Sequence, residues 1–235
     1  MNIKGIIFDC DGTLVDSEEH HYLAWKHAFG KHGVEIDPTL YVNFAGKGDE
    51  YVLDYSHELI GSDCTQEIFF HKNAHYRQLQ QEGIVPVAPT VDFLHRLYAE
   101  RQQHGLKLGV ASGARKEDIV HALQLLEVEH YFEAVLSGAD DLPEYSDPEG
   151  TNKPKPYVYL KAAKLLGVPS EACIAIEDSA PGVAAAVAAG CFTIAVPNLI
   201  TQNHDLSQAH LTLPSLAGMT VAQLLHLVEQ HVFMD

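Results

Sequence analysis

Basic residues are scarce in this sequence of 235 residues, which has 15 lysines and arginines against 32 aspartates and glutamates. The formal net charge of −17 repels nucleic-acid phosphates and anionic membrane surfaces, so we expect neither a nucleic-acid nor a membrane partner. Long apolar runs are also lacking, since none reaches the roughly 20 residues that cross a bilayer. The brief apolar stretch at the N-terminus soon ends in an acid, so we expect no targeting segment.

Cysteine is rare, and its four copies form no C-x-x-C pair: Cys10, Cys64, Cys173 and Cys191. So few in a chain of this length do not make a disulfide framework, which predicts reduced thiols and a cytoplasmic protein. No glycine-rich dinucleotide fingerprint follows the first apolar segment, which argues against a nicotinamide-dependent enzyme. The 15 histidines show no H-E-x-x-H spacing typical of a zinc site.

Five short, continuously apolar segments indicate β-strands: Ile3–Phe8, Leu106–Ala111, Ala134–Leu136, Cys173–Ile176 and Phe192–Val196. Helical patterns separate most of them: Val91–Gln103, Glu117–Leu126, Tyr157–Leu166 and Val183–Ala189. Strands without polar alternation, joined through single helices, predict a doubly wound α/β fold whose parallel sheet is covered on both faces. Such sheets carry their active sites at the carboxyl ends of the strands.

The interval after the first strand breaks this alternation. It contains helical patterns at Ser17–Lys31, Leu53–Ile60 and Thr65–Gln81, and no convincing strand. We therefore expect two parts: an α/β core formed by 1–16 with 84–235, and a small helical cap formed by 17–83. An insert at this place would stand over the carboxyl end of the first strand and act as a lid.

Two carboxylates follow the first strand in the segment Asp9-Cys10-Asp11-Gly12-Thr13. In an extended stretch Asp9 and Asp11 would face the same way, with Cys10 pointing into the fold. Carboxylates so close repel each other unless a cation or a proton intervenes, and Mg²⁺ suits such oxygen ligands. The alternative is an ordinary turn, because Asp and Gly are common turn residues.

Polar residues also follow three later strands, as Ser112-Gly113, Lys153-Pro154-Lys155-Pro156 and Glu177-Asp178-Ser179. Each has an ordinary explanation as a loop, a solvated charge or a helix cap. Since the carboxyl ends of parallel strands meet in space, a hydroxyl, a lysine and further carboxylates would join the first pair. Together they predict a site for phosphoryl transfer, which depends on positioning and charge neutralisation.

At this point the sequence resembles the haloacid dehalogenase superfamily, specifically its phosphatase and β-phosphoglucomutase-like branch with a helical cap. The order and spacing of the motifs match over nearly the whole chain. They are Asp9-x-Asp11-Gly12-Thr13-Leu14-Val15-Asp16-Ser17, Ser112-Gly113, Lys153-Pro154-x-Pro156 and Glu177-Asp178-Ser179-x-x-Gly182.

The resemblance implies a role for each of these residues. Asp9 would be the nucleophile that becomes an aspartyl phosphate, and Asp11 the general acid and then the base. The phosphoryl oxygens would be bound by Thr13, Ser112 and Gly113, and Lys153 would balance charge. Mg²⁺ would be held by Asp9, the backbone carbonyl of Asp11 and Asp178, with Glu177 nearby or acting through water. The expected protein is a monomeric, magnesium-dependent phosphatase of a small phosphorylated metabolite, such as a sugar phosphate.

Three alternatives stay open to different degrees. A phosphomutase would need a cap that grips a second phosphate, for which the candidates are His21, Lys47 and Lys72. The loop around Lys47 has no arginine fork, which favours the phosphatase. A non-catalytic binding protein on the same fold is the alternative of another class. A true dehalogenase is disfavoured, because it would lack the acid found at Asp11.

One segment departs from the family pattern. The connection 138–152 is longer and more acidic than usual, and we interpret it as a solvated loop.

Overall fold

The computed structural model describes residues 2–41, 52, 55, 60 and 65–232. The chain divides into two compact units, an α/β unit of residues 1–15 with 86–235 and a helical unit of residues 16–85. The boundaries predicted from the sequence lie within two residues of this division. Within the described part, none of the helices has the length and apolar character needed to cross a membrane.

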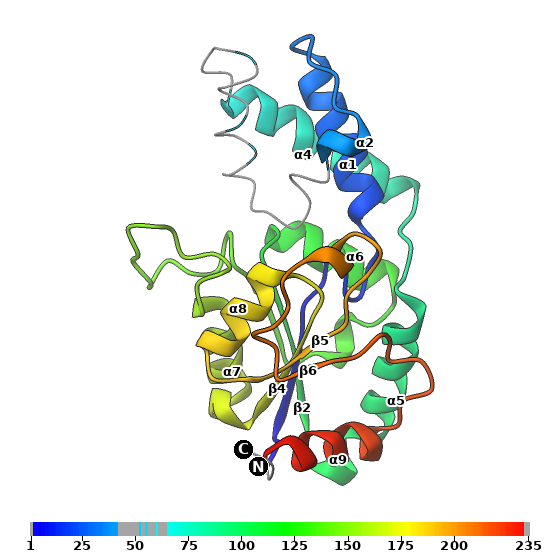
Figure 1. Cartoon of the computed structure of the whole chain (residues 1–235), viewed down its shortest axis with the longest axis vertical. Helices are drawn as coiled ribbons and strands as arrows, with labels where there is room; N and C mark the ends of the chain where they lie inside the picture. The colour runs from blue at the N-terminus through cyan, green and yellow to red at the C-terminus, as the bar shows by residue number, and fades with distance from the viewer. Residues whose placement is uncertain (1, 42–51, 53–54, 56–59, 61–64, 233–235) are drawn as a thin grey trace. The chain divides into compact units, whose positions relative to one another are not determined.

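The α/β unit is built on a sheet of six parallel strands in the order β3-β2-β1-β4-β5-β6. Four of these strands, β2, β4, β5 and β6, are labelled in Figure 1. Their bounds are β1 Gly5–Phe8, β2 Lys107–Ser112, β3 Ala134–Ser137, β4 Cys173–Glu177, β5 Phe192–Ala195 and β6 Leu211–Thr212. The predicted fold class, a doubly wound parallel sheet, is confirmed. The five predicted strands are all present, and β6 is an additional edge strand of two residues that is too short to leave an apolar pattern.

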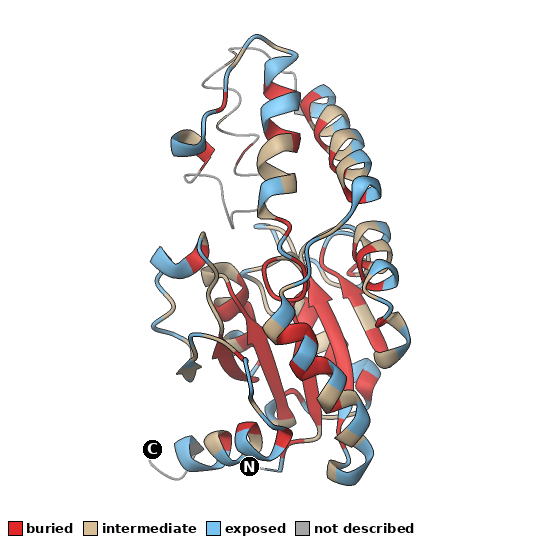
Figure 2. Ribbon diagram, turned by 90° about the vertical axis from the view of Figure 1, so that its right-hand side faces the viewer, coloured by how far each residue is buried: buried red, intermediate tan, exposed pale blue. Residues whose placement is uncertain are grey.

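The register of the central strands decides which side chains can meet. Phe8, the last residue of β1, lies opposite Val110 of β2 and Ile176 of β4. The next residues along the chain, Asp9 just after β1 and Glu177 at the end of β4, are therefore neighbours at the carboxyl edge. Strand β1 is buried throughout, which explains its uninterrupted apolar sequence. The strands of the sheet are coloured mostly as buried in Figure 2.

The helices of the α/β unit are α5 Ala88–His104, α6 Lys116–Leu125, α7 Tyr157–Leu166, α8 Ala180–Ala188 and α9 Val221–Val232, with short 3₁₀ turns at Glu129–Tyr131, Ser170–Ala172 and Thr201–Asn203. Helix α9 was not predicted, although Val221, Leu224 and Val228 form a buried stripe with helical spacing. Helix α7 contacts β1, β2 and β3. It contributes much of one hydrophobic core, including Val158, Tyr159, Ala162, Ala163 and Leu166.

The helical unit contains α1 Glu18–Gly30, α2 Pro38–Tyr41 and α4 Thr65–Glu82. Helices α1 and α4 pack against each other, and α1 buries Trp25 and Phe29. The predictions of helices at 17–31 and 65–81 agree with α1 and α4. The predicted helix at 53–60 falls largely outside the described residues.

Two adjacent leucines on α7 test this arrangement. Leu166 is buried in the core, whereas Leu165 is 58% exposed. We expect Leu166→Ala to lower the free energy of unfolding of the α/β unit by about 2–5 kcal/mol, because it removes buried methyl groups and leaves a cavity. Leu165→Ala is the control and should change it by no more than about 0.5 kcal/mol. Urea unfolding followed by circular dichroism measures both, and equal effects would contradict the assigned face of α7.

Candidate active site

The loop that follows β1 brings Asp9 to the carboxyl edge of the sheet. Asp9 is buried, and its backbone N–H donates to the carbonyl of Ile176 at 2.9 Å. The chain then turns back, since the carbonyl of Cys10 accepts from the N–H groups of Leu14 and Val15 at 2.8 and 3.0 Å. These bonds close a turn that encloses residues 11–13. The inward position of the Cys10 side chain is as expected.

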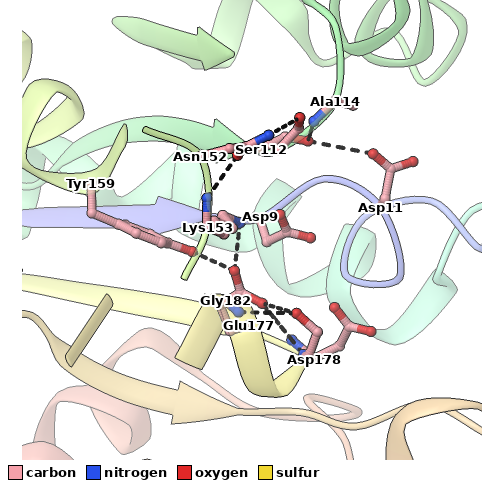
Figure 3. Close-up of polar contacts among 12 residues, drawn as sticks. Asp9, Asp11, Ser112, Ala114, Asn152, Lys153, Tyr159, Glu177, Asp178 and Gly182 are labelled. Carbon is pink, nitrogen blue, oxygen red and sulfur yellow. Dashed lines mark hydrogen bonds and ion pairs between the residues drawn. The ribbon is translucent and has the colours of Figure 1, made fainter. Parts of the chain in front are cut away.

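Lys153 links this loop to β4 through two short ion pairs (Figure 3). Its Nζ lies 2.6 Å from Oδ1 of Asp9 and 2.6 Å from Oε1 of Glu177. Burial lowers the pKa of Lys153, but the two carboxylates more than offset this, so the net pKa lies above the ordinary value. The ammonium group is therefore charged, and it is fixed between the nucleophile candidate and a fully buried glutamate.

Glu177 is held in place by several donors besides Lys153. The hydroxyl of Tyr159 donates to Oε1 at 2.7 Å, and Oε2 accepts from the N–H of Asp178 at 3.1 Å and from Oγ of Ser179 at 3.2 Å. The carboxylate also packs on Gly182 at the start of α8, where a Cβ atom would come within 2.0 Å of it. Only glycine leaves this space, which explains its place in the motif.

Asn152 connects Lys153 to the loop after β2. Its Nδ2 donates to the carbonyl of Gly113 at 2.9 Å, and its Oδ1 accepts from the N–H of Lys153 at 2.8 Å. A Cβ on Gly138 would come within 2.2 Å of Oδ1 of Asn152, so the loop after β3 also packs closely here. Sequence reasoning missed Asn152, although its position directly before the lysine was a usable signal.

Asp178 is buried and faces the loop after β1. Its Oδ2 accepts from Nδ2 of Asn198 at 2.9 Å, and the same amide group lies 3.4 Å from the carbonyl oxygen of Gly12. Gly12 has a φ of 81°, and a Cβ atom there would lie 2.3 Å from Oδ2 of Asp178. Asn198, which follows β5, was not predicted, and its only sequence signal was its place after a strand.

Three carboxylates meet closely enough to bind one cation. Ligand atoms of Asp9, Glu177 and Asp178 all lie within 4.8 Å of one another, and all three residues are buried. Burial raises the pKa of Asp9, and Glu177 and Asp11 add to the rise against the opposing effect of Lys153. A divalent cation would offset this accumulation of negative charge, and a set of carboxylate oxygens suits Mg²⁺. The residues therefore fit the predicted metal.

The Asp11 side chain is not part of this trio. Its Oδ2 lies 3.4 Å from Oγ of Ser112, at the end of β2. Ser112 is buried, and its Oγ accepts from the N–H of Ala114 at 3.0 Å. Oγ1 of Thr13 is also buried, and no hydrogen-bond partner for it occurs among the described residues. An unpaired buried hydroxyl in this loop suits a site that binds an oxygen-rich ligand.

Two of the three candidates in the helical unit lie together. Nζ of Lys72 lies 5.3 Å from the ring centroid of Trp25 and 5.5 Å from that of Tyr76, and the ring of His21 stacks on Tyr76 at 4.4 Å. Lys72 is only 5% exposed, so a solvated surface position is excluded for it. The third candidate, Lys47, lies outside the described residues.

The acidic connection 138–152 is a largely exposed loop, as the sequence predicted. Several of its carboxylates also form ion pairs with lysines of the α/β unit. The pairs are Lys116–Asp141 at 2.9 Å, Lys161–Glu144 at 2.8 Å, Lys155–Asp147 at 3.5 Å and Lys155–Glu149 at 2.5 Å.

Known proteins are similar to this chain in sequence and in fold. A family model described as haloacid dehalogenase-like hydrolase matches residues 3–190. Hexitol phosphatase A of Escherichia coli (strain K12) is 29% identical over 230 residues, covering 95% of this chain and 96% of that protein. Beta-phosphoglucomutase of Bacillus subtilis (strain 168) is 28% identical over 236 residues, covering 95% and 94%.

A solved structure gives the same result for the fold. The crystal structure of beta-phosphoglucomutase from Clostridium difficile has a TM-score of 0.78 at 24% identity, covering 98% of this chain and 99% of that one. The family predicted from the motifs, and the phosphatase class of enzyme within it, are confirmed. The chain belongs to the haloacid dehalogenase-like hydrolases.

Proposed function

We propose that this protein is a magnesium-dependent phosphatase that hydrolyses a small-molecule phosphate monoester through an aspartyl phosphate on Asp9. The observation that carries the proposal is the buried ion pair between Lys153 and Asp9, at 2.6 Å, beside a trio of carboxylates. A salt bridge with only a structural role would not need the two further acids, Glu177 and Asp178, at the same place. A site that combines a nucleophile, a charge-balancing lysine and a metal does need additional carboxylates.

In the first half of the reaction, an oxygen of Asp9 attacks phosphorus, the bond from phosphorus to the leaving oxygen breaks, and Asp11 donates a proton to that oxygen. Lys153 balances the negative charge of Asp9 and of the phosphoryl group. The hydroxyls of Thr13 and Ser112, with the backbone N–H of Gly113, bind phosphoryl oxygens. Oγ1 of Thr13 has no hydrogen-bond partner among the described residues, which supports this role, because a bound phosphoryl oxygen would supply one.

In the second half, Asp11 accepts a proton from water, whose oxygen attacks phosphorus. The bond between phosphorus and Asp9 breaks, and inorganic phosphate leaves with the Asp9 carboxylate restored. The same side chain thus serves first as the acid and then as the base. Its contact with Ser112 supports this role, since Ser112 is also a proposed phosphate ligand.

Mg²⁺ would be held by Asp9, Asp178 and the backbone carbonyl of Asp11. When bound, it supplies positive charge that stabilises the phosphoryl oxygens. Glu177 belongs to the same carboxylate group, but its oxygens already accept from protein donors, so we place it beside the metal or in contact through water. Asn198 would orient Asp178 as a ligand.

We propose that the substrate is a small phosphorylated metabolite, and we favour sugar phosphates among these. The similarity to hexitol phosphatase A supports this choice. Within the helical unit, we propose Lys72 and His21 as substrate contacts, because both lie against the ring of Tyr76 and so form one cluster. Lys47 stays a prediction. We also propose that the protein is a monomer and that it is cytoplasmic. The free thiols of Cys10, Cys173 and Cys191 support the cytoplasmic location.

A phosphomutase is the second candidate. The similarity to beta-phosphoglucomutase of Bacillus subtilis favours it, as does the buried Lys72, which could bind a non-transferring phosphate. A mutase must keep water from its aspartyl phosphate while the sugar phosphate is reoriented. The core residues are the same for both reactions, so the difference has to be measured.

The role of Asp9 is tested by Asp9→Asn. We expect magnesium-dependent hydrolysis of p-nitrophenyl phosphate and of a panel of sugar phosphates to fall to background, because an amide cannot act as the nucleophile. Circular dichroism and the melting temperature control for folding. A folded variant that retains about a tenth of wild-type kcat would contradict the assignment, since loss of a covalent nucleophile costs far more than that.

Asp178→Ala tests the metal site. The variant should need a higher Mg²⁺ concentration for half-maximal activity, or lose activity, because it lacks a direct ligand. Asp92→Ala, which removes an exposed carboxylate on α5, is the matched control and should leave the Mg²⁺ dependence unchanged. An unchanged Mg²⁺ dependence in Asp178→Ala would show that this carboxylate serves only the start of α8.

Phosphatase and mutase are separated by their products. The protein is supplied with β-glucose 1-phosphate and a trace of the 1,6-bisphosphate, and both free phosphate and glucose 6-phosphate are followed. We expect release of phosphate to dominate, because water would reach the aspartyl phosphate. Rapid formation of glucose 6-phosphate with little free phosphate would establish the mutase instead.

A further inference from the structure

Tyr159 carries a hydroxyl in the middle of a hydrophobic core. The residue is fully buried and lies on α7 among apolar side chains of the same core. A phenylalanine would fill the same volume, and burying a hydroxyl is unfavourable unless it finds a partner. Burial, followed by the nearby Glu177 carboxylate, raises the pKa of Tyr159 well above its ordinary value, so the group is a neutral hydrogen-bond donor. Its acceptor, Glu177, therefore explains why a tyrosine stands here.

That acceptor is shared with the catalytic lysine. Oε1 of Glu177 receives the Tyr159 hydroxyl at 2.7 Å and Nζ of Lys153 at 2.6 Å (Figure 3). Nζ of Lys153 also lies 5.1 Å from the centroid of the Tyr159 ring. The ring of Tyr159 thus lies near the Lys153 ammonium group, and its hydroxyl binds Glu177, which is a counter-ion of that ammonium group.

Two carboxylates compete for one ammonium group. Lys153 is 2.6 Å both from Asp9 and from Glu177, so its position depends on the relative negative charge of the two oxygens. A hydroxyl that donates to Glu177 reduces the charge on that oxygen and weakens its hold on the lysine. No corresponding donor other than Lys153 is found for Oδ1 of Asp9 among the hydrogen bonds of the described residues.

We propose that Tyr159 is a positioning residue: by sharing Oε1 of Glu177 with Lys153, it keeps the ammonium group on Asp9. The inference rests on the proposed function, because it assigns Lys153 to the phosphoryl-transfer step. Without the hydroxyl, Lys153 would move toward Glu177. Asp9 would then carry more uncompensated negative charge, which lowers the contribution of Lys153 to catalysis and strengthens the attraction of Asp9 for a cation.

The test is Tyr159→Phe, with Tyr157→Phe as the matched control. Tyr157 lies two residues earlier on α7, and its hydroxyl is bound to Asp147 at 3.0 Å, away from Glu177. For Tyr159→Phe we expect kcat for p-nitrophenyl phosphate to fall about tenfold, as for loss of one hydrogen bond to a charged group, with KM within about twofold. By calorimetry, Mg²⁺ should bind about threefold more tightly than to wild type, because Asp9 is less neutralised. Tyr157→Phe should match wild type in all three.

A purely structural role predicts a different result, namely weaker Mg²⁺ binding together with a lower kcat and a lower melting temperature. That result, or a kcat within about twofold of the Tyr157→Phe control, would overturn the proposal. Failure of the proposed function would appear in the wild type itself, as Mg²⁺ binding without hydrolysis. The calorimetric comparison of the two variants would still test Tyr159 in that case. Tighter Mg²⁺ binding by Tyr159→Phe, but not by Tyr157→Phe, would support the proposed role of Tyr159, and equal Mg²⁺ binding by the two variants would refute it.

Discussion

The site depends on one buried interaction, in which the Lys153 ammonium lies between Asp9 and Glu177. Each group would be unfavourable alone in the interior, because an unpaired buried charge is strongly destabilising. Together they fix the position of the carboxylate that we propose as the nucleophile. Glu177 can serve in this way because the N-terminal turn of α8, through Ser179 and the close approach at Gly182, holds its carboxylate.

The net charge of −17 makes this arrangement necessary for an enzyme of anionic substrates. The protein as a whole repels a phosphate ester, so attraction has to be produced locally. Lys153, the N–H groups of the loop after β2 and the proposed Mg²⁺ would supply it at the carboxyl edge of the sheet. The acidic connection 138–152 repels a phosphate ester less than its number of carboxylates suggests, because several of them are paired with Lys116, Lys155 and Lys161.

Much of the fold could be predicted, because strands buried on both faces leave uninterrupted apolar segments and parallel strands end at one edge. The same logic predicts that Asp9 and Glu177 meet at that edge, as they do. The conformation after Asp9 could not be predicted in this way, since the chain turns back on Cys10 through local hydrogen bonds. Tyr159 and Asn198 were missed for a related reason. Their roles arise from hydrogen bonds between segments far apart in the sequence, and such bonds leave no periodic pattern in the sequence.

In the proposed mechanism, Asp9 forms a covalent phosphoryl adduct while it is paired with Lys153. A crystal structure of the protein with Mg²⁺, beryllium and fluoride tests it directly, because beryllofluoride imitates the phosphoryl group of an aspartyl phosphate. We expect beryllofluoride on the Asp9 carboxylate, with Lys153, Thr13 and Ser112 within hydrogen-bonding distance of the adduct. An adduct on another carboxylate, or a bound Mg²⁺ with an unmodified Asp9, would contradict it.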